Sequence, residues 1–369
     1  TIQEAEKDMQ ELLAFLQTKL EPLGLVMVGM GSYPTLFTKH EATRLNYILV
    51  RDGRMGKVGR GWDLFSGNHV WLDIKKEEFA EACHMFTRLS GVLIALFGNA
   101  PFVEGKPTKV MENRATYFEG LKDHGFFFGL PEKPYTSFYD ALKLIFDLPA
   151  YIFNTPEAKV YMTEEEMTNL EYFQKDKVKM VRTDGEKAVL TPILTQLTDM
   201  TRNLFTEMRV KWKFKEGTTV CSFMDAFVKK DNQSLLDQVE GVFLEVRTIP
   251  TQKFSEMAAG PAFLLGCQMN QEKIISLLDQ HDDAFWLKLR EDAVRGGLDF
   301  DIDGKHITTF AQELVDLAKE GLEKRGHGEE KFLAPLYERI KNKQNPAQET
   351  LALLEQKDIK EVVAAFTFS

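Results

Sequence analysis

Hydrophobic periodicity along the chain predicts long helices near both ends and shorter elements between them. Apolar residues recur at helical spacing over residues 2–21 and 77–97, and "GNAPF" ends the second pattern. The chain after Phe254 is helical in pattern almost throughout. Shorter helical patterns cover residues 111–121, 137–146, 192–207 and 222–229. Strand-like runs cover residues 23–31, 68–74, 149–154 and 243–251.

These elements do not follow the regular strand-helix alternation of a doubly wound sheet. Several strands set among many helices favour an α+β fold. The segment from about residue 155 to 240 is charged and mixed, with a turn at "TDGE". We therefore divide the chain into residues 1–153, a variable, insertion-like region at 154–241, and residues 242–369.

Two of the strands separate apolar from polar side chains. Successive side chains of a strand point to opposite faces. In the strand at 68–74, one face carries Val70, Leu72 and Ile74 and the other His69, Trp71 and Asp73. In "FLEVRTIPT", Leu244 and Val246 share one face and Glu245 and Arg247 the other. The pattern fits a sheet whose inner surface is a polar cradle, and also an antiparallel sheet with one face in water.

Composition narrows the classes of function. The chain has 369 residues, 44% hydrophobic and 28% charged, with 28 phenylalanines, which is typical of a globular protein with an aromatic core. Its net charge of -10 argues against nucleic-acid and anionic-membrane partners. A run of about 18 uncharged apolar residues is absent, so we expect no membrane span. The three widely spaced cysteines indicate reduced thiols in the cytoplasm.

Two loop patterns carry weaker signals. Glycines at 53, 56, 59 and 61 match neither phosphate-binding spacing, so we expect a turn-rich connection. "DFDIDGK" at 299–305 resembles the first half of a calcium loop, but Phe310 stands where a bidentate glutamate is needed. We expect an acidic loop before a helix at about 308–325. Signatures of hydrolytic nucleophiles and kinases are absent from the sequence.

The stretch "ALFGNAPFVEGKP" at 95–107 is the most informative part of the chain. A helix ends at Gly98 and Asn99, the chain turns at Pro101, and Glu104 and Lys106 follow around a glycine. Arg114 lies shortly beyond. Charged groups beside a sharp helix end can hold a small zwitterion, although a solvated loop also carries such charges.

At these residues the sequence resembles the plant and proteobacterial type of glutamate-cysteine ligases. The resemblance rests on "ALFGNAPFVEGKP", "ENRATYF", "LEVRTIPTQ" and "GLEKRGHGEEKFLAPLYERIKNKQNPAQETL", in the family's order. It extends over roughly residues 1–153 and 243–354 and leaves the middle unaligned.

The resemblance implies a fold similar to the glutamine-synthetase catalytic domain, with a curved antiparallel sheet, helices outside and the site on the concave face. It also implies an ATP- and Mg²⁺-dependent reaction. The γ-carboxyl of glutamate would become an acyl phosphate, and the amine of cysteine would attack it. Its cofactors would be ATP and Mg²⁺, and its partners small molecules.

The resemblance also suggests roles for individual residues. It assigns Arg114 to the α-carboxylate of glutamate, and Arg247, with Lys106, to the transferring phosphate. Glu245 would contact Mg²⁺ or the incoming amine, with Asp73 as a second metal ligand. We expect the remaining substrate contacts from Asn99, Glu104, Lys106, His69 and Trp71.

The chain departs from the family pattern in two places. A glutamate-rich motif of the family's first strands does not occur, so either that motif precedes Thr1 or the protein lacks half of the family's metal site. "LFSGNHVWLDI" also differs from the corresponding family strand, which leaves the acceptor amine open. Two alternatives therefore stand beside glutamate-cysteine ligation. One is a noncatalytic homologue that acts as a binding or regulatory protein, and the other is a ligase for a different amine.

Overall fold

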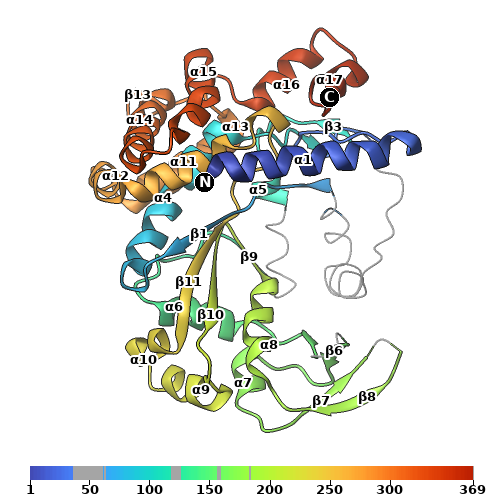
Figure 1. Cartoon of the computed structure of the whole chain (residues 1–369), viewed down its shortest axis with the longest axis vertical. Helices are drawn as coiled ribbons and strands as arrows, with labels where there is room; N and C mark the ends of the chain where they lie inside the picture. Colours follow the sequence, from blue (N-terminus) through green and yellow to red (C-terminus); the bar gives the residue numbers. More distant parts are fainter. Residues whose placement is uncertain (36–60, 62–63, 118–125, 156–158, 183, 369) are drawn as a thin grey trace.

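A computed structural model of the chain describes residues 1–35, 61, 64–117, 126–155, 159–182 and 184–368. Figure 1 shows a helix-rich part that holds both termini, and a smaller part with short strands at the opposite end. A twisted sheet runs between the two parts. Helices combined with open, mainly antiparallel sheets confirm the α+β class.

The helices differ widely in length. They are α1 (Ile2–Leu20), α4 (Phe79–Phe97), α5 (Arg114–Tyr117), α6 (Phe138–Asp147), α7 (Asn169–Phe173), α8 (Leu194–Asp199), α9 (Val220–Val228), α10 (Asn232–Asp237), α11 (Ala259–Met269), α12 (Gln271–Leu278), α13 (Asp283–Gly296), α14 (Ile307–Arg325), α15 (Ala334–Asn342), α16 (Pro346–Leu354) and α17 (Ile359–Ala365).

The strands are short, and most pair with an antiparallel neighbour. They are β1 (Val70–Ile74), β2 (Phe102–Val103), β3 (Lys106–Pro107), β4 (Phe127–Gly129), β5 (Ile152–Asn154), β6 (Val160–Thr163), β7 (Val178–Val181), β8 (Lys187–Leu190), β9 (Leu204–Thr206), β10 (Met208–Phe214), β11 (Val239–Val246), β12 (Asp301–Ile302) and β13 (Lys305–His306). The pair β4-β9 is parallel, and β5-β6-β7-β8 form a four-stranded antiparallel sheet.

The central sheet has the order β1-β11-β10, and both pairings are antiparallel. Leu72, Leu244 and Val210 lie side by side in this sheet and are buried. They belong to a hydrophobic core that also contains most of α4. The predicted division of β1 and β11 into an apolar and a polar face therefore corresponds to a core face and a face that carries charged groups.

Helix α4 positions a second layer behind the sheet. Its C-terminal half is buried on all sides, and it ends at Gly98, shortly before Pro101. A Cβ atom on Gly91 would lie 2.6 Å from the Leu289 side chain and 2.8 Å from the Arg290 backbone nitrogen. The absence of that atom lets α13 approach α4 closely, which places Arg290 beside the end of the sheet.

Two predicted elements differ from the structure, and one strand of the central sheet was not predicted. The strand predicted at residues 23–31 is wrong, because its backbone pairs with the C-terminal tail only through the bridge from Val28 to Thr367. The helix predicted at 192–207 ends as an α-helix at Asp199, continues as a 3-10 helix over Met200–Asn203, and is followed by strand β9. Strand β10 was not predicted, although Met208, Val210 and Trp212 alternate with basic residues.

The structure describes one of the two predicted loops. In the segment 299–305, strands β12 and β13 form a tight hairpin, whose turn residues Asp303 and Gly304 have φ angles of 51° and 73°. Positive φ at both positions is typical of a two-residue hairpin turn. Helix α14 follows directly. The glycines at 53, 56 and 59 lie outside the described residues.

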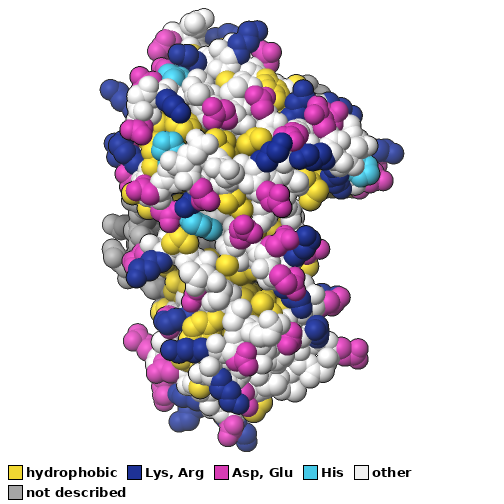
Figure 2. Space-filling model, turned by 90° about the vertical axis from the view of Figure 1, so that its left-hand side faces the viewer, with side chains coloured by type: hydrophobic (Ala, Val, Ile, Leu, Met, Phe, Trp, Pro, Cys, Tyr) yellow, Lys and Arg dark blue, Asp and Glu magenta, His cyan; other side chains and the backbone are white. Residues whose placement is uncertain are grey.

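Residues Lys76–Phe97 form a helical stretch long and apolar enough to cross a membrane, but 72% of its apolar window is buried inside the structure. A core helix of a globular protein has the same properties. On the face shown in Figure 2, acidic and basic side chains are interspersed, with hydrophobic side chains exposed between them.

Candidate functional site

Sheet register brings the polar residues of three strands together. Trp71 of β1 and Arg209 of β10 lie on either side of Glu245 in β11. Directly paired residues in antiparallel strands project to the same face. The next row on this face is Asp73, Phe243 and Lys211. The basic residues of β10 therefore stand beside the acid of β11.

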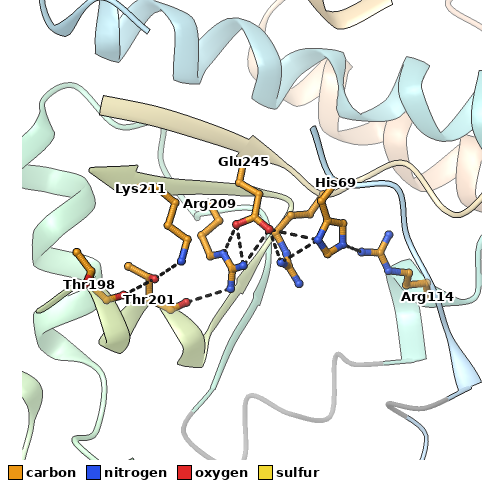
Figure 3. A network of polar contacts seen from close by, with 8 residues as sticks. His69, Arg114, Thr198, Thr201, Arg209, Lys211 and Glu245 are labelled. Atoms are coloured by element: carbon orange, nitrogen blue, oxygen red, sulfur yellow. Dashed lines mark hydrogen bonds and ion pairs between the residues drawn. The ribbon is translucent and has the colours of Figure 1, made fainter. Parts of the chain in front are cut away.

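The carboxylate of Glu245 is the centre of a compact ionic cluster (Figure 3). Arg209 donates to both of its oxygens at 2.7 and 2.9 Å, and Arg247 donates to one of them at 2.8 Å. His69 Nδ1 lies 3.2 Å from the same carboxylate. Only 2% of the Glu245 side chain is exposed. We call Glu245, Arg209, Arg247 and His69 the Glu245 cluster.

These neighbours determine the charge of Glu245. Burial raises the pKa of the carboxyl, but the hydrogen bond from His69 and the charges of Arg209 and Arg247 outweigh it. The pKa of Glu245 therefore lies well below its usual range. Burial and the charge of Arg209 lower the pKa of Arg247 to about 9, which still leaves it cationic at neutral pH.

His69 connects this cluster to Arg114. One guanidinium nitrogen of Arg114 lies 3.0 Å from His69 Nε2. Burial lowers the pKa of His69 to about 4, and the charges of Arg247 and Arg114 act in the same direction. The imidazole is therefore neutral near pH 7. In the tautomer that satisfies both neighbours, Nδ1–H donates to Glu245 and Nε2 accepts from Arg114.

A cavity of about 130 Å³ lies beside this chain of contacts. Phe65, Ile94, Ala115, Phe128 and Phe205 supply its apolar walls. Its polar lining is His69, Arg114, Arg247, Glu112, Glu207, Thr206 and Thr248. The cavity thus has arginines and carboxylates in one lining, which is suited to a small ligand with charges of both signs.

Within the described residues, four buried polar atoms of this lining have no hydrogen-bond partner. They are Glu112 Oε1, Glu207 Oε2, Thr206 Oγ1 and Thr248 Oγ1. Buried polar groups in native proteins are almost always hydrogen-bonded, because an unpaired one costs about 1–3 kcal/mol. Several such atoms around one cavity therefore indicate a place for a polar ligand.

The carboxyl group of Glu112 has few hydrogen-bond partners. It is 1% exposed, and its Oε2 accepts one hydrogen bond from the Asn99 backbone N–H at 3.3 Å. Burial raises the pKa of Glu112 to about 8, although the positive charge of Arg114 acts in the opposite direction. The negative charge of Glu207 adds to the increase. Glu112 is therefore mostly protonated near pH 7.

Glu207 precedes β10 and is 7% exposed. Arg290 of α13 donates from Nε to its Oε1 at 2.9 Å, and the second oxygen is the unpartnered one. The carbonyl oxygen of Glu207 also accepts from the Arg247 backbone N–H at 2.7 Å. This backbone contact joins the wall that carries Glu207 to the end of β11.

The structure gathers four of the predicted site residues and separates the others. Glu245, Arg247, His69 and Arg114 form one continuous network. Asn99 is buried, and its amide donates to the Gly29 and Thr251 carbonyls, which is a structural contact. Asn99 and Glu245 are buried but lie outside the cavity lining, and the exposed residues outside it are Glu104, Lys106, Trp71 and Asp73. The functional roles of all these residues stay predictions.

The metal role predicted for Glu245 and Asp73 finds no support in these contacts. Glu245 is engaged by two guanidinium groups and an imidazole, and a carboxylate so surrounded has little to offer a cation. Asp73 is paired with Phe243, in a different row of the sheet from Glu245. Within the described part of the chain, no three His, Cys, Asp or Glu side chains form a metal-ligating group.

Sequence reasoning missed five residues of the site. They are Glu112, Thr206, Glu207, Arg209 and Thr248. The alternation in "MRVKWKF" was sufficient to predict β10 and so Arg209. Glu112 lies two positions before Arg114, which offered a second, weaker signal.

Comparison with known proteins supports the resemblance. Residues 1–144 match the model of the family described as Glutamate-cysteine ligase family 2 (GCS2). The chain is 26% identical to the chloroplastic glutamate-cysteine ligase of Solanum lycopersicum over 356 residues, which cover 90% of this chain and 58% of the relative. The corresponding protein of Nicotiana tabacum is 24% identical with the same coverage.

A third relative is chloroplastic glutamate-cysteine ligase A of Oryza sativa subsp. indica, 24% identical over 362 residues, 91% of this chain and 63% of the relative. The chain thus spans less than two thirds of the length of these curated relatives. The matches extend through the middle region, which the sequence motifs had left unaligned. Residues 1–144 therefore match glutamate-cysteine ligase family 2, and the chain as a whole is a distant relative of the plant glutamate-cysteine ligases.

Proposed function

We propose that this chain is, or is part of, an ATP-dependent ligase that joins the γ-carboxyl of glutamate to the amine of cysteine. The observation that supports this most directly is the cavity between Arg114, Arg247, Glu112 and Glu207. Its lining carries arginines that can pair with a carboxylate and acids that can pair with an ammonium, which is the charge distribution of an amino acid. Similarity to the plant glutamate-cysteine ligases supports this reaction class.

In this proposal Arg114 binds the α-carboxylate of glutamate. The neutral imidazole of His69 accepts from one guanidinium nitrogen of Arg114, so the plane of the group is set before the ligand arrives. A preorganised bidentate donor loses less entropy when it pairs with a carboxylate.

Arg209 and Lys211 lie in successive rows on the polar face of β10, and Arg247 donates to the same Glu245 oxygen as Arg209. They can stabilise negative charge on a phosphoryl group that passes from ATP to the γ-carboxyl, which breaks the bond to ADP, releases ADP and forms an acyl phosphate. The nitrogen of the neutral amine then bonds to the acyl carbon, the carbon–oxygen bond to phosphate breaks, and inorganic phosphate and one proton of the amine leave. The residues described fit no magnesium site, so no step is assigned to the metal.

Purified protein incubated with ATP, Mg²⁺, glutamate and cysteine tests this function. We expect ADP release only when both amino acids are present, together with formation of γ-glutamylcysteine by mass spectrometry. A panel of other amines in place of cysteine identifies a different acceptor. Failure to release ADP with every amine would contradict a ligase.

A noncatalytic amino-acid-binding protein is the second candidate. It is favoured by the Glu245 cluster, in which arginines engage the carboxylate predicted to face the metal. Saturable glutamate binding without ADP release would support it. We also propose a cytoplasmic location. The three cysteines, which are free thiols, are consistent with that location.

A further inference from the structure

The four unpartnered atoms of the cavity share one chemical property. The two carboxylate oxygens and the two threonine hydroxyl oxygens can all accept hydrogen bonds. Their side chains are each at least nine-tenths buried, so bulk water does not satisfy them. The ligand group that fits this set is a donor of several hydrogen bonds.

Charge narrows the choice of donor. The lining has two ionisable acids, Glu112 and Glu207, and two arginines, Arg114 and Arg247, while His69 is neutral. Arg290 is paired with Glu207 from outside this lining. A divalent cation usually needs an excess of negative ligands, which this set does not have. A primary ammonium carries one charge and three donors, and it satisfies several acceptors at once.

We propose that Glu112, Glu207, Thr206 and Thr248 form an amine subsite that binds the ammonium group of the ligand. Arg114 lies in the same lining and takes the α-carboxylate. The amine subsite therefore makes the cavity prefer ligands that carry an ammonium group close to a carboxylate. The inference rests on the proposed function only for the choice of glutamate as the probe.

Binding at this subsite is coupled to a proton. Among the described residues, two charged groups face Glu112. One is Arg114, the first residue of α5, and the other is Glu207, which precedes β10 and is paired with Arg290 of α13. Burial raises the pKa of Glu112 to about 8, and an ammonium at its free oxygen lowers it again. Ligand binding near pH 7 therefore releases a proton.

The test is calorimetric binding of L-glutamate and glutarate to the full chain without ATP. Glutarate has the same two carboxylates and lacks the amine. In Glu112→Gln the amide oxygen still accepts from Asn99, but the negative charge is lost. We expect its affinity for glutamate to fall by about tenfold or more, and its affinity for glutarate to stay unchanged.

Proton release separates a binding role from a structural one. Titrations in two buffers of different ionisation enthalpy give the number of protons released with glutamate. We expect release with the wild type and none with Glu112→Gln. The matched control is Glu330→Gln, because Glu330 also has a buried unpartnered oxygen but lies outside the cavity. It should behave as the wild type.

Several outcomes would overturn the subsite. They are equal losses for glutamate and glutarate in Glu112→Gln, unchanged affinity for both, and a wild type that binds neither. Binding of Mg²⁺ alone that disappears in Glu112→Gln, while glutamate affinity is kept, would make the set a metal site instead. If Glu112→Gln does not fold, Thr248→Val serves in its place, with a smaller loss that is again confined to glutamate.

Failure of the subsite and failure of the ligase proposal remain distinguishable. Binding without ATP reports only on the subsite, and ADP release reports only on catalysis. Amine-selective binding with no ADP release would leave the subsite intact and remove the ligase.

Discussion

Glu245 and Glu112 are both buried glutamates beside Arg114's network, yet their surroundings differ. Glu245 receives hydrogen bonds from two arginines, whereas Glu112 receives one from a backbone N–H and has an unpartnered oxygen. The pKa of Glu245 lies well below its usual range and that of Glu112 well above it. Burial is common to both, so the hydrogen bond from His69 and the charges of Arg209 and Arg247 account for the difference in pKa. The Glu245 cluster is complete without a ligand, and the amine subsite is not.

Of the substitutions considered, Glu245→Gln should have the largest effect on the free energy of unfolding. It leaves Arg209 and Arg247 buried with no ionic partner on β11, which should lower the free energy of unfolding by about 3–5 kcal/mol. Urea denaturation followed by circular dichroism measures this. Glu240→Gln, an exposed position on the same strand, should cost less than about 1 kcal/mol. Similar small losses for both would mean that the cluster is not what stabilises the sheet.

Arg114→Ala tests the residue that lies between the two glutamates. Losing a bidentate, charge-assisted pair should weaken glutamate binding by about 2–4 kcal/mol and leave ATP binding nearly unchanged. Separate calorimetric titrations with each ligand check it. Lys109→Ala is the control, because Lys109 is exposed and outside the cavity lining. Equal losses of glutamate and ATP affinity would show that Arg114 has another role.

Glu112 should make stability depend on pH. Its pKa is raised from 4.5 to about 8 on folding, so its contribution is fully present below pH 4.5 and is lost as pH rises through 8. Between pH 5 and pH 8 the wild type should lose about 3–4 kcal/mol more than Glu112→Gln. Urea midpoints at pH 5 and pH 8 measure the difference. Parallel pH profiles for the two proteins would contradict a protonated Glu112.

Gly67→Ala should have the smallest effect. A Cβ atom there would lie 2.9 Å from the guanidinium of Arg114, so the arginine must shift although the backbone need not. We expect glutamate affinity to fall by about 1 kcal/mol with little change in stability. Gly241→Ala is the control, since its Cβ would make an ordinary contact at 3.4 Å. A stability loss with unchanged affinity would show that the backbone moves instead of Arg114.

The sequence predicted those parts of the site that repeat along a strand. Alternation in β1 and β11 correctly separated Leu72 and Leu244 from Glu245. The same alternation is present in β10, but its three basic residues made the segment read as part of a charged, mixed region. Arg209, which lies in β10, was therefore not predicted as a site residue either.

Glu112 and Glu207 could not be predicted by periodicity, because neither lies within a regular strand or helix. Glu112 is buried because its backbone N–H bonds to Val294, which is almost two hundred residues away in sequence. Glu207 is buried because α13 brings Arg290 to it. Such contacts depend on tertiary packing, which a local pattern does not contain.

The register of the central sheet also limits how the chain can be aligned with distant relatives. One extra or missing residue in β1, β10 or β11 would turn every following side chain to the opposite face. Glu245 would then point into the core around α4, and Leu244 would point toward the cations. Gaps in an alignment therefore belong outside Val70–Ile74, Met208–Phe214 and Val239–Val246. Length differences of the family in this region should accumulate between β10 and β11, where helices α9 and α10 connect the strands.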